Sequence, residues 1–251
     1  MRSDCVSYVA QMISWLTWMI LCLTALGTAA LSAVIGMAGG VILLAVMLLF
    51  LPVEIAIPIH AAVQLISNST RVILFIRHVE WKVWALFSLP ATLGILVGRE
   101  IFAAVDPQYL RYIIATFILI ATYLPKPKAD KAWPFWPFLL AGAIAGTMGM
   151  LVGAVGPIIA PFFIHAKLLK EKMIATKAVC QATIHVLKLI AFGTLGFSFG
   201  EHGTFILALG AAVILGTYLG KRLLHHVSEP LFIRLVKIAL TLIAVKLIVW
   251  G

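Results

Sequence analysis

Apolar runs long enough to cross a lipid bilayer recur along the whole chain, and they limit the fold more than any other feature. Residues 12–34, for example, contain no charged side chain. A bilayer-spanning helix needs ~20 mostly apolar residues. Only 11% of the 251 residues are charged, against about 25% in a soluble domain. The sequence therefore predicts an all-α polytopic membrane protein, and residues 12–34 are too long for the core of a signal peptide.

The net charge of +10 raises the question of a nucleic-acid partner, but the placement of the basic residues favours a membrane. They gather in four short loops, at residues 77–82, 126–131, 167–172 and 221–222. Short basic loops between apolar runs are typical of the cytoplasmic side of membrane proteins. We therefore expect the lipid bilayer as a partner and no nucleic acid.

The chain contains one unit twice. When Gly36 is aligned with Gly153, Gln64 falls on Gln181 without a gap. This alignment predicts a first membrane repeat at residues 1–124, a cytoplasmic linker at 125–134 and a second repeat at 135–251. Each repeat has about five helical elements. They are predicted at residues 12–35, 41–51, 55–76, 83–104 and 109–124, and at 135–151, 158–166, 173–197, 204–224 and 231–250.

An odd number of elements places the two repeats in opposite orientations across the membrane. Counting crossings puts all four basic loops on one face, whereas the short loops on the other face carry only the acids Glu54, Asp106 and Glu201. We therefore predict two inverted-topology repeats in the cell (inner) membrane, with the basic loops cytoplasmic and both termini outside.

The second element of each repeat is short. Residues 41–51 would form a helix of about 16 Å, roughly half of the ~30 Å hydrocarbon core. Broken helices of this kind surround the substrate site in many secondary transporters. The loop charges do not separate a full span from a re-entrant hairpin for elements 41–51 and 158–166.

Polar side chains form a stripe on the third element of each repeat. The residues at matching positions are His60, Gln64, Asn68 and Arg71 in the first repeat, and Lys177, Gln181, His185 and Lys188 in the second. Their spacing places each set on one helical face. A Lys or Arg at mid-bilayer costs ~2.5–3.5 kcal/mol, so we expect the stripes to face a protein-lined cavity. For Lys177 alone, snorkelling toward the nearby basic loop is an equally good interpretation.

None of the nine acidic residues falls within either stripe, so the cavity should attract a small anion. We predict that Arg71 and Lys188 supply charge and that Gln64, Asn68, Gln181 and His185 donate hydrogen bonds. The glycine-rich turns at Gly39, Gly40 and Gly156 would present backbone amides at the positive ends of short helices. The G-x-x-x-G pairs at Gly94, Gly142 and Gly216 are better interpreted as sites of close helix packing.

Titratable groups suggest coupling to protons but no enzyme. His60 and His185 are candidates for proton coupling. Because the chain has no nucleotide-binding loop, we expect transport to be driven by an ion gradient, with H⁺ or Na⁺ as possible coupling ions, or by the substrate gradient alone. Cys5, Cys22 and Cys180 have no metal spacing, so we expect no metal, no cofactor and no catalytic residue. The sequence leaves open whether the chain forms a homo-oligomer.

The motifs resemble those of the TauE/SafE sulfite exporter family, which are membrane permeases. The resemblance rests on "GMAGGVILL" (36–44), "GAVGPIIAPFF" (153–163), "VEW" (79–81) and the duplicated layout, and it extends from about Gly27 to Trp250. It implies a sulfur oxyanion as substrate, such as sulfite or an organosulfonate like sulfoacetate. We therefore predict a secondary transporter that works by alternating access. An anion channel is the main alternative, and an integral-membrane enzyme is a weaker one.

Overall fold

The structure is a computed structural model that describes residues 15–35, 39–124, 132–168, 170–223 and 229–249. These residues form ten α-helices and one short 3-10 helix, and no strand. In chain order they are α2 (Trp15–Ile35), α3 (Gly39–Met47), α4 (Val53–Phe75), η1 (Ile76–His78), α5 (Trp81–Ala104), α6 (Pro107–Tyr123), α7 (Pro137–Val152), α8 (Gly156–His165), α9 (Lys170–Thr194), α10 (Gly203–Leu223) and α11 (Glu229–Val249).

The predicted all-α class is confirmed, and each predicted element corresponds to one helix. Most helices begin a few residues before the apolar run that predicted them. The start of α6 has a clear cause, since the Asp106 side chain accepts a hydrogen bond of 2.8 Å from the backbone amide of Gln108. Pro107 occupies the first turn, where a missing amide hydrogen has no cost.

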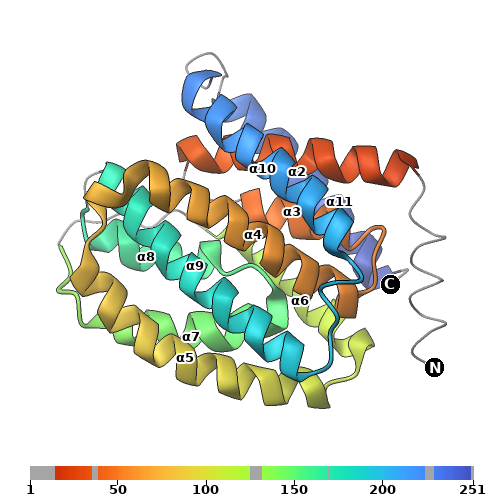
Figure 1. The fold of residues 1–251 in the computed structure, drawn as a ribbon, viewed down its shortest axis with the longest axis horizontal. Coiled ribbons are helices and arrows are strands. Elements are labelled where there is room, and N and C mark those ends of the chain that lie inside the picture. The colour runs from red at the N-terminus through yellow and green to blue at the C-terminus, as the bar shows by residue number, and fades with distance from the viewer. Residues whose placement is uncertain (1–14, 36–38, 125–131, 169, 224–228, 250–251) are drawn as a thin grey trace.

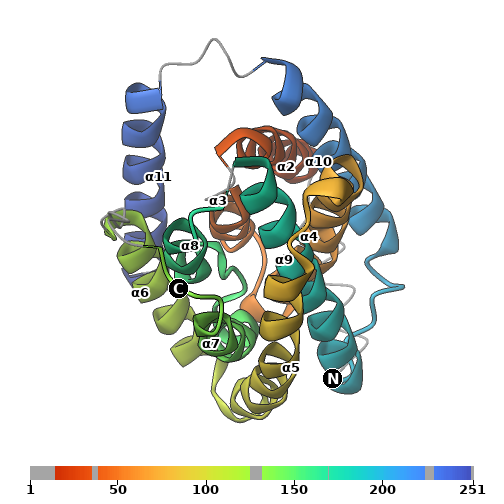
Figure 2. The same ribbon diagram turned by 90° about the vertical axis from the view of Figure 1, so that its left-hand side faces the viewer.

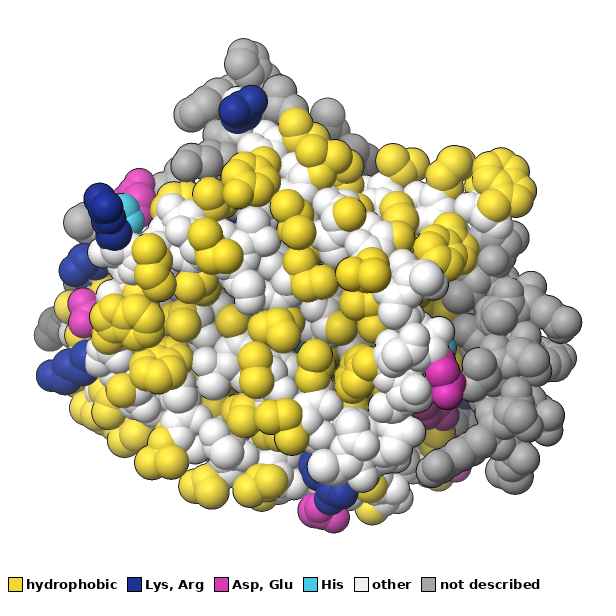
Figure 3. Space-filling view, in the orientation of Figure 1, with side chains coloured by type: hydrophobic (Ala, Val, Ile, Leu, Met, Phe, Trp, Pro, Cys, Tyr) yellow, Lys and Arg dark blue, Asp and Glu magenta, His cyan; other side chains and the backbone are white. Residues whose placement is uncertain are grey.

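Five of the described helices, α2, α4, α5, α9 and α10, are long and apolar enough to cross a membrane. Large apolar side chains cover the outer surface, among them Leu89, with 72% exposed, and Leu207, with 69% exposed. In Figure 3 apolar side chains spread across the middle of the face, whereas charged side chains gather at its margins. An apolar surface of this extent suits lipid and not water, so the chain is a multi-pass membrane protein.

The short helices α3 and α8 lie in the interior, surrounded by the long helices (Figure 2). They have 9 and 10 residues, which correspond to about 14 and 15 Å of helix. Neither length is enough to cross a ~30 Å hydrocarbon core. Neither α3 nor α8 can therefore span the hydrocarbon core alone, which argues against the full-span alternative that the sequence left open.

The long helices pack in pairs that are related by exchange of the two halves of the chain. α5 packs on α7 as α10 packs on α2, and α5 packs on α9 as α10 packs on α4. α4 pairs with α9 near the centre, where they run side by side in Figure 1, and α6 pairs with α11. This pattern supports a duplicated unit. The opposite orientation of the two repeats and their boundaries at residues 125–134 stay predictions, and most of that linker lies outside the described residues.

The G-x-x-x-G pairs lie where two backbones meet, as the packing interpretation requires. A Cβ atom on Gly94 of α5 would overlap the carbonyl oxygen of Ala143 on α7, and one on Gly216 of α10 would overlap the carbonyl oxygen of Leu26 on α2. Gly142 of α7 meets the Phe87 carbonyl oxygen of α5 in the same way. Glycine at these positions allows the two helices of each pair to approach closely.

We expect Gly94→Ala to destabilise the protein by about 1–3 kcal/mol, because the added methyl group forces α5 away from α7. The measurement is thermal unfolding of purified protein in detergent. Gly27→Ala in α2 is the matched control, since a Cβ there meets no atom within 4 Å. Equal unfolding temperatures for the two variants would contradict this account of the packing.

Candidate functional site

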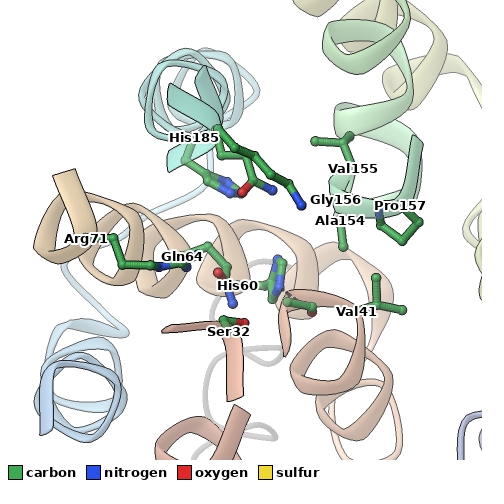
Figure 4. A pocket seen from close by; sticks show the side chains of 13 residues that line it. Ser32, Val41, His60, Gln64, Arg71, Ala154, Val155, Gly156, Pro157 and His185 are labelled. Carbon is green, nitrogen blue, oxygen red and sulfur yellow. Dashed lines mark hydrogen bonds between the residues drawn. The ribbon is translucent and has the colours of Figure 1, made fainter. Parts of the chain in front are cut away.

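A pocket opens where α4 and α9 lie side by side and face the starts of α3 and α8 (Figure 4). Its volume, counted as the space open to the centre of a water molecule, is about 30 Å³, which leaves room for a small ion. The lining residues are Ser32 of α2, Gly40 and Val41 of α3, His60, Gln64 and Arg71 of α4, Ala154 and Val155 before α8, Gly156 and Pro157 of α8, and Lys177, Gln181 and His185 of α9.

The stripe on α4 is buried and points into the pocket. His60, Gln64 and Arg71 expose 0%, 7% and 5% of their surface. The His60 Nε2 atom lies 2.8 Å from the Gly40 carbonyl oxygen. A carbonyl oxygen only accepts, so this nitrogen carries the hydrogen and donates. The bond connects α4 to the start of α3, and the His60 ring faces that of His185 with 6.2 Å between centroids.

Arg71 is held in place from its own helix. Its Nε donates to the Ser67 carbonyl oxygen at 3.3 Å, and its Nη2 donates to the Ser67 hydroxyl at 3.1 Å. A guanidinium group has five N–H donors. The remaining donors have no acceptor within the described part of the chain, so the group can bind an acceptor that enters the pocket.

The start of α8 brings two side-chain nitrogens close to one backbone glycine. A Cβ atom on Gly156 would lie 3.6 Å from Gln181 Nε2 and 4.0 Å from Lys177 Nζ, so both nitrogens face the space beside this glycine. Val155, the residue before the helix, gives no side-chain cap to the first amides. Uncapped amides at a helix start carry partial positive charge and bind anions.

Three residues predicted as ligands do not line the pocket. Gly39 is a packing position, because a Cβ there would overlap the Ser32 hydroxyl. Asn68 is buried beneath the pocket and donates to the Gln64 carbonyl oxygen at 2.8 Å. Lys188 is fully buried, and its Nζ donates to the Gly153 carbonyl oxygen at 2.9 Å. The substrate-binding roles of these residues remain predictions.

Sequence reasoning left Lys177 out of the site. The snorkelling interpretation does not match the structure, because Lys177 is 4% exposed and lines the pocket. The repeat alignment matches Lys177 with His60 of the first stripe, and this match could have predicted that Lys177 belongs to the site. Ser32, Ala154 and Pro157 also line the pocket, and no sequence signal singled them out, because their positions depend on how helices pack.

Carboxylates are missing from the pocket lining as described. Among the described residues, Glu80 forms an ion pair with Lys172 at 3.6 Å, Glu100 pairs with its neighbour Arg99, and Glu54 is exposed. No group of three or more His, Cys, Asp or Glu residues in the described ranges could hold a metal ion. The arrangement is therefore a buried cluster of cationic and amide groups that is suited to an anion.

The family comparison agrees with this chemistry. A family model described as "Sulfite exporter TauE/SafE" matches residues 21–247 of the chain. No curated protein and no solved structure matches the chain. Because the matched region includes every described helix of both halves except the ends of the first and last, the chain belongs to the TauE/SafE sulfite exporter family of membrane transporters.

Proposed function

We propose that this protein is a secondary carrier for a small sulfur oxyanion, either sulfite or an organosulfonate such as sulfoacetate. The observation that carries the proposal is the pocket at the start of α8, where cationic and amide groups converge without a carboxylate. A buried positive charge is costly unless it is paired. A small anion can pair with Arg71, whose remaining N–H donors have no acceptor within the described residues, and membership in a sulfite exporter family makes a sulfur oxyanion the natural choice.

The roles of the lining residues follow from their chemistry. Lys177 supplies charge and Gln181 supplies amide N–H groups next to Gly156. Across the pocket, Gln64 and Arg71 offer further donors from α4. An oxyanion with three oxygens can accept from several of these groups at once, and hydrogen bonds of this kind are stronger when the acceptor is charged.

Alternating access is the mechanism that this arrangement favours. The pocket lies between α4 and α9, which come from opposite halves of the chain, and each is flanked by a long helix of the other half. Movement of one half against the other would therefore open the pocket first to one side and then to the other. We further propose that the basic loops are cytoplasmic and that the membrane is the cell inner membrane.

An anion channel and a membrane enzyme are the competing classes. Counterflow separates a carrier from a channel, because unlabelled anion on one side drives labelled anion into the vesicle only through a site that opens alternately. For an enzyme, the pocket would need an acid–base pair or an activated nucleophile. The transporter family of the chain favours the carrier.

Lys177→Met should raise the sulfite concentration for half-maximal uptake into proteoliposomes by about ten- to a hundredfold. A hydrogen bond to a charged group contributes about 1.5–3 kcal/mol, and 1.4 kcal/mol corresponds to a factor of ten. Lys172→Met is the control, because it removes the same charge from an exposed position of α9 that is paired with Glu80. If the two variants transport equally well, Lys177 is no anion ligand.

Gly156→Leu should abolish uptake while leaving the folded protein intact. The new side chain would occupy the space that Gln181 Nε2 and Lys177 Nζ face, and this is the space assigned to the anion. Gly193→Leu is the control, since position 193 of α9 is exposed and a Cβ there meets no atom within 4 Å. Normal uptake by Gly156→Leu would exclude the start of α8 as the binding position.

The two proposed membrane faces can be told apart by labelling. In a variant without Cys5, Cys22 and Cys180, a single cysteine at Lys82 should react with a membrane-impermeant maleimide only from the cytoplasmic side. A single cysteine at Glu201 should react only from outside, because positive loops stay in the cytoplasm. Labelling of both positions from the same side would contradict the inverted topology.

A further inference from the structure

Lys188 of α9 is a buried lysine that the anion pocket does not use. Its side chain is fully buried and is among the largest fully buried side chains described. Its Nζ donates to one acceptor, the Gly153 carbonyl oxygen at 2.9 Å, and lies 6.0 Å from the centre of the Phe192 ring. A protonated amine has three N–H donors. With one carbonyl oxygen as acceptor, two of these donors would have no partner, so these surroundings suit a neutral amine better than a cation.

Within the described ranges, basic side chains lie near Lys188, and no acidic side chain pairs with it. On α9 itself, His185 lies one turn earlier and Lys177 lies three turns earlier. Across the helix pair, α4 contributes His60 and Arg71, which line the same pocket as His185, and its one acid, Glu54 in the first turn, is exposed.

The other elements that pack on α9 add no charge at this depth. α7 contains no titratable residue, and α8 has only His165 at its last position. α5 has Lys82, Arg99 and Glu100 near its two ends, and η1 has the exposed Arg77 and His78. A charged Lys188 is therefore not balanced by any described acidic group.

An anion in the pocket changes this balance. It would place negative charge on the same side of the α4–α9 pair as Lys188, close to the start of α8. The Gly153 carbonyl, which Lys188 holds, lies three residues before Gly156, where the proposed anion binds. Gly153 ends α7 with φ +75°, a backbone conformation that favours glycine. The lysine and the anion thus contact opposite ends of one turn.

We propose that Lys188 carries a proton through the transport cycle, so that anion and proton cross the membrane together. When the anion binds, the Nζ amine takes a proton from water on the entry side and forms a new N–H bond. When the anion leaves, this bond breaks and the proton returns to water on the exit side. The inference rests on the proposed function, and it names the coupling ion of that same site.

Lysine is the better carrier than the two histidines for a chemical reason. It is the stronger base, so among these three groups the first proton goes to Lys188. His60 already uses its Nε2 hydrogen toward the Gly40 carbonyl oxygen. The Nδ1 atoms of His60 and His185 are buried and have no partner among the described residues. His185 lines the pocket one turn from Lys188 and provides a path for the proton.

The test is the pH dependence of anion binding to purified protein in detergent, with methanesulfonate as the probe. This anion stays ionised, so any pH dependence belongs to the protein. From about pH 6 to about pH 9, the affinity of the wild type should fall at the alkaline end by up to about tenfold per pH unit, as the uptake of one proton requires.

Two variants of Lys188 make the assignment specific. Lys188→Met, which cannot be protonated, should bind more weakly and without this pH dependence. Lys188→Arg keeps a donor toward Gly153 and a permanent charge, so its binding should also be independent of pH, and it remains informative if the methionine variant does not fold. His60→Gln, which preserves an N–H donor for Gly40, and Lys177→Met test the other titratable groups of the pocket, whereas the surface variant Lys172→Met should keep the wild-type dependence.

Each other outcome overturns the inference in a recognisable way. Wild-type binding that does not change with pH would exclude proton coupling but leave the anion site intact. A dependence that persists in both Lys188 variants and disappears in Lys177→Met or His60→Gln would assign the proton to that residue instead. If the wild type binds neither methanesulfonate nor sulfite at any pH, the proposed function itself fails.

Discussion

Positive charge buried in the interior of a membrane protein is the constraint on which the rest of this structure depends. A bilayer offers no water to solvate Arg71, Lys177 or Lys188, and the pocket that they approach has no carboxylate in its described lining. Oxygen atoms of the protein offset part of this cost. Arg71 donates to the carbonyl and hydroxyl oxygens of Ser67, and Lys188 donates to the carbonyl oxygen of Gly153. We propose that a ligand supplies the rest of the balance, which would make the pocket selective for anions.

The half-length helices make such a pocket compatible with a membrane. A full-length helix satisfies its own backbone groups, whereas α8 begins in the interior, where Gly156 and Pro157 line the pocket. The long helices that surround it pack closely through glycines such as Gly94 and Gly216, and they keep lipid away from the polar interior. The fold therefore combines hydrogen-bond donors in the interior with a surrounding layer of closely packed helices.

The sequence predicted the helices, their approximate bounds and the buried face of α4 and α9, because hydrophobic length and helical spacing are local properties. It also predicted that Gln64, Arg71, Gln181 and His185 share one site, since the repeat alignment places them at matching depths. The sequence did not predict which residues of the two stripes line the pocket and which hold the backbone beside it. Lys177 and Lys188 are three turns apart on one face, and only the position of the α7–α8 turn decides which of them lines the pocket and which holds Gly153.

Diffraction at the selenium absorption edge, from crystals grown with selenite as a heavier analogue of sulfite, tests the central claim most directly. The account predicts one strong anomalous peak beside Gly156, within hydrogen-bond distance of Gln181 Nε2 and close to Lys177 Nζ. Peaks confined to the basic loops, with only water beside Gly156, would contradict it.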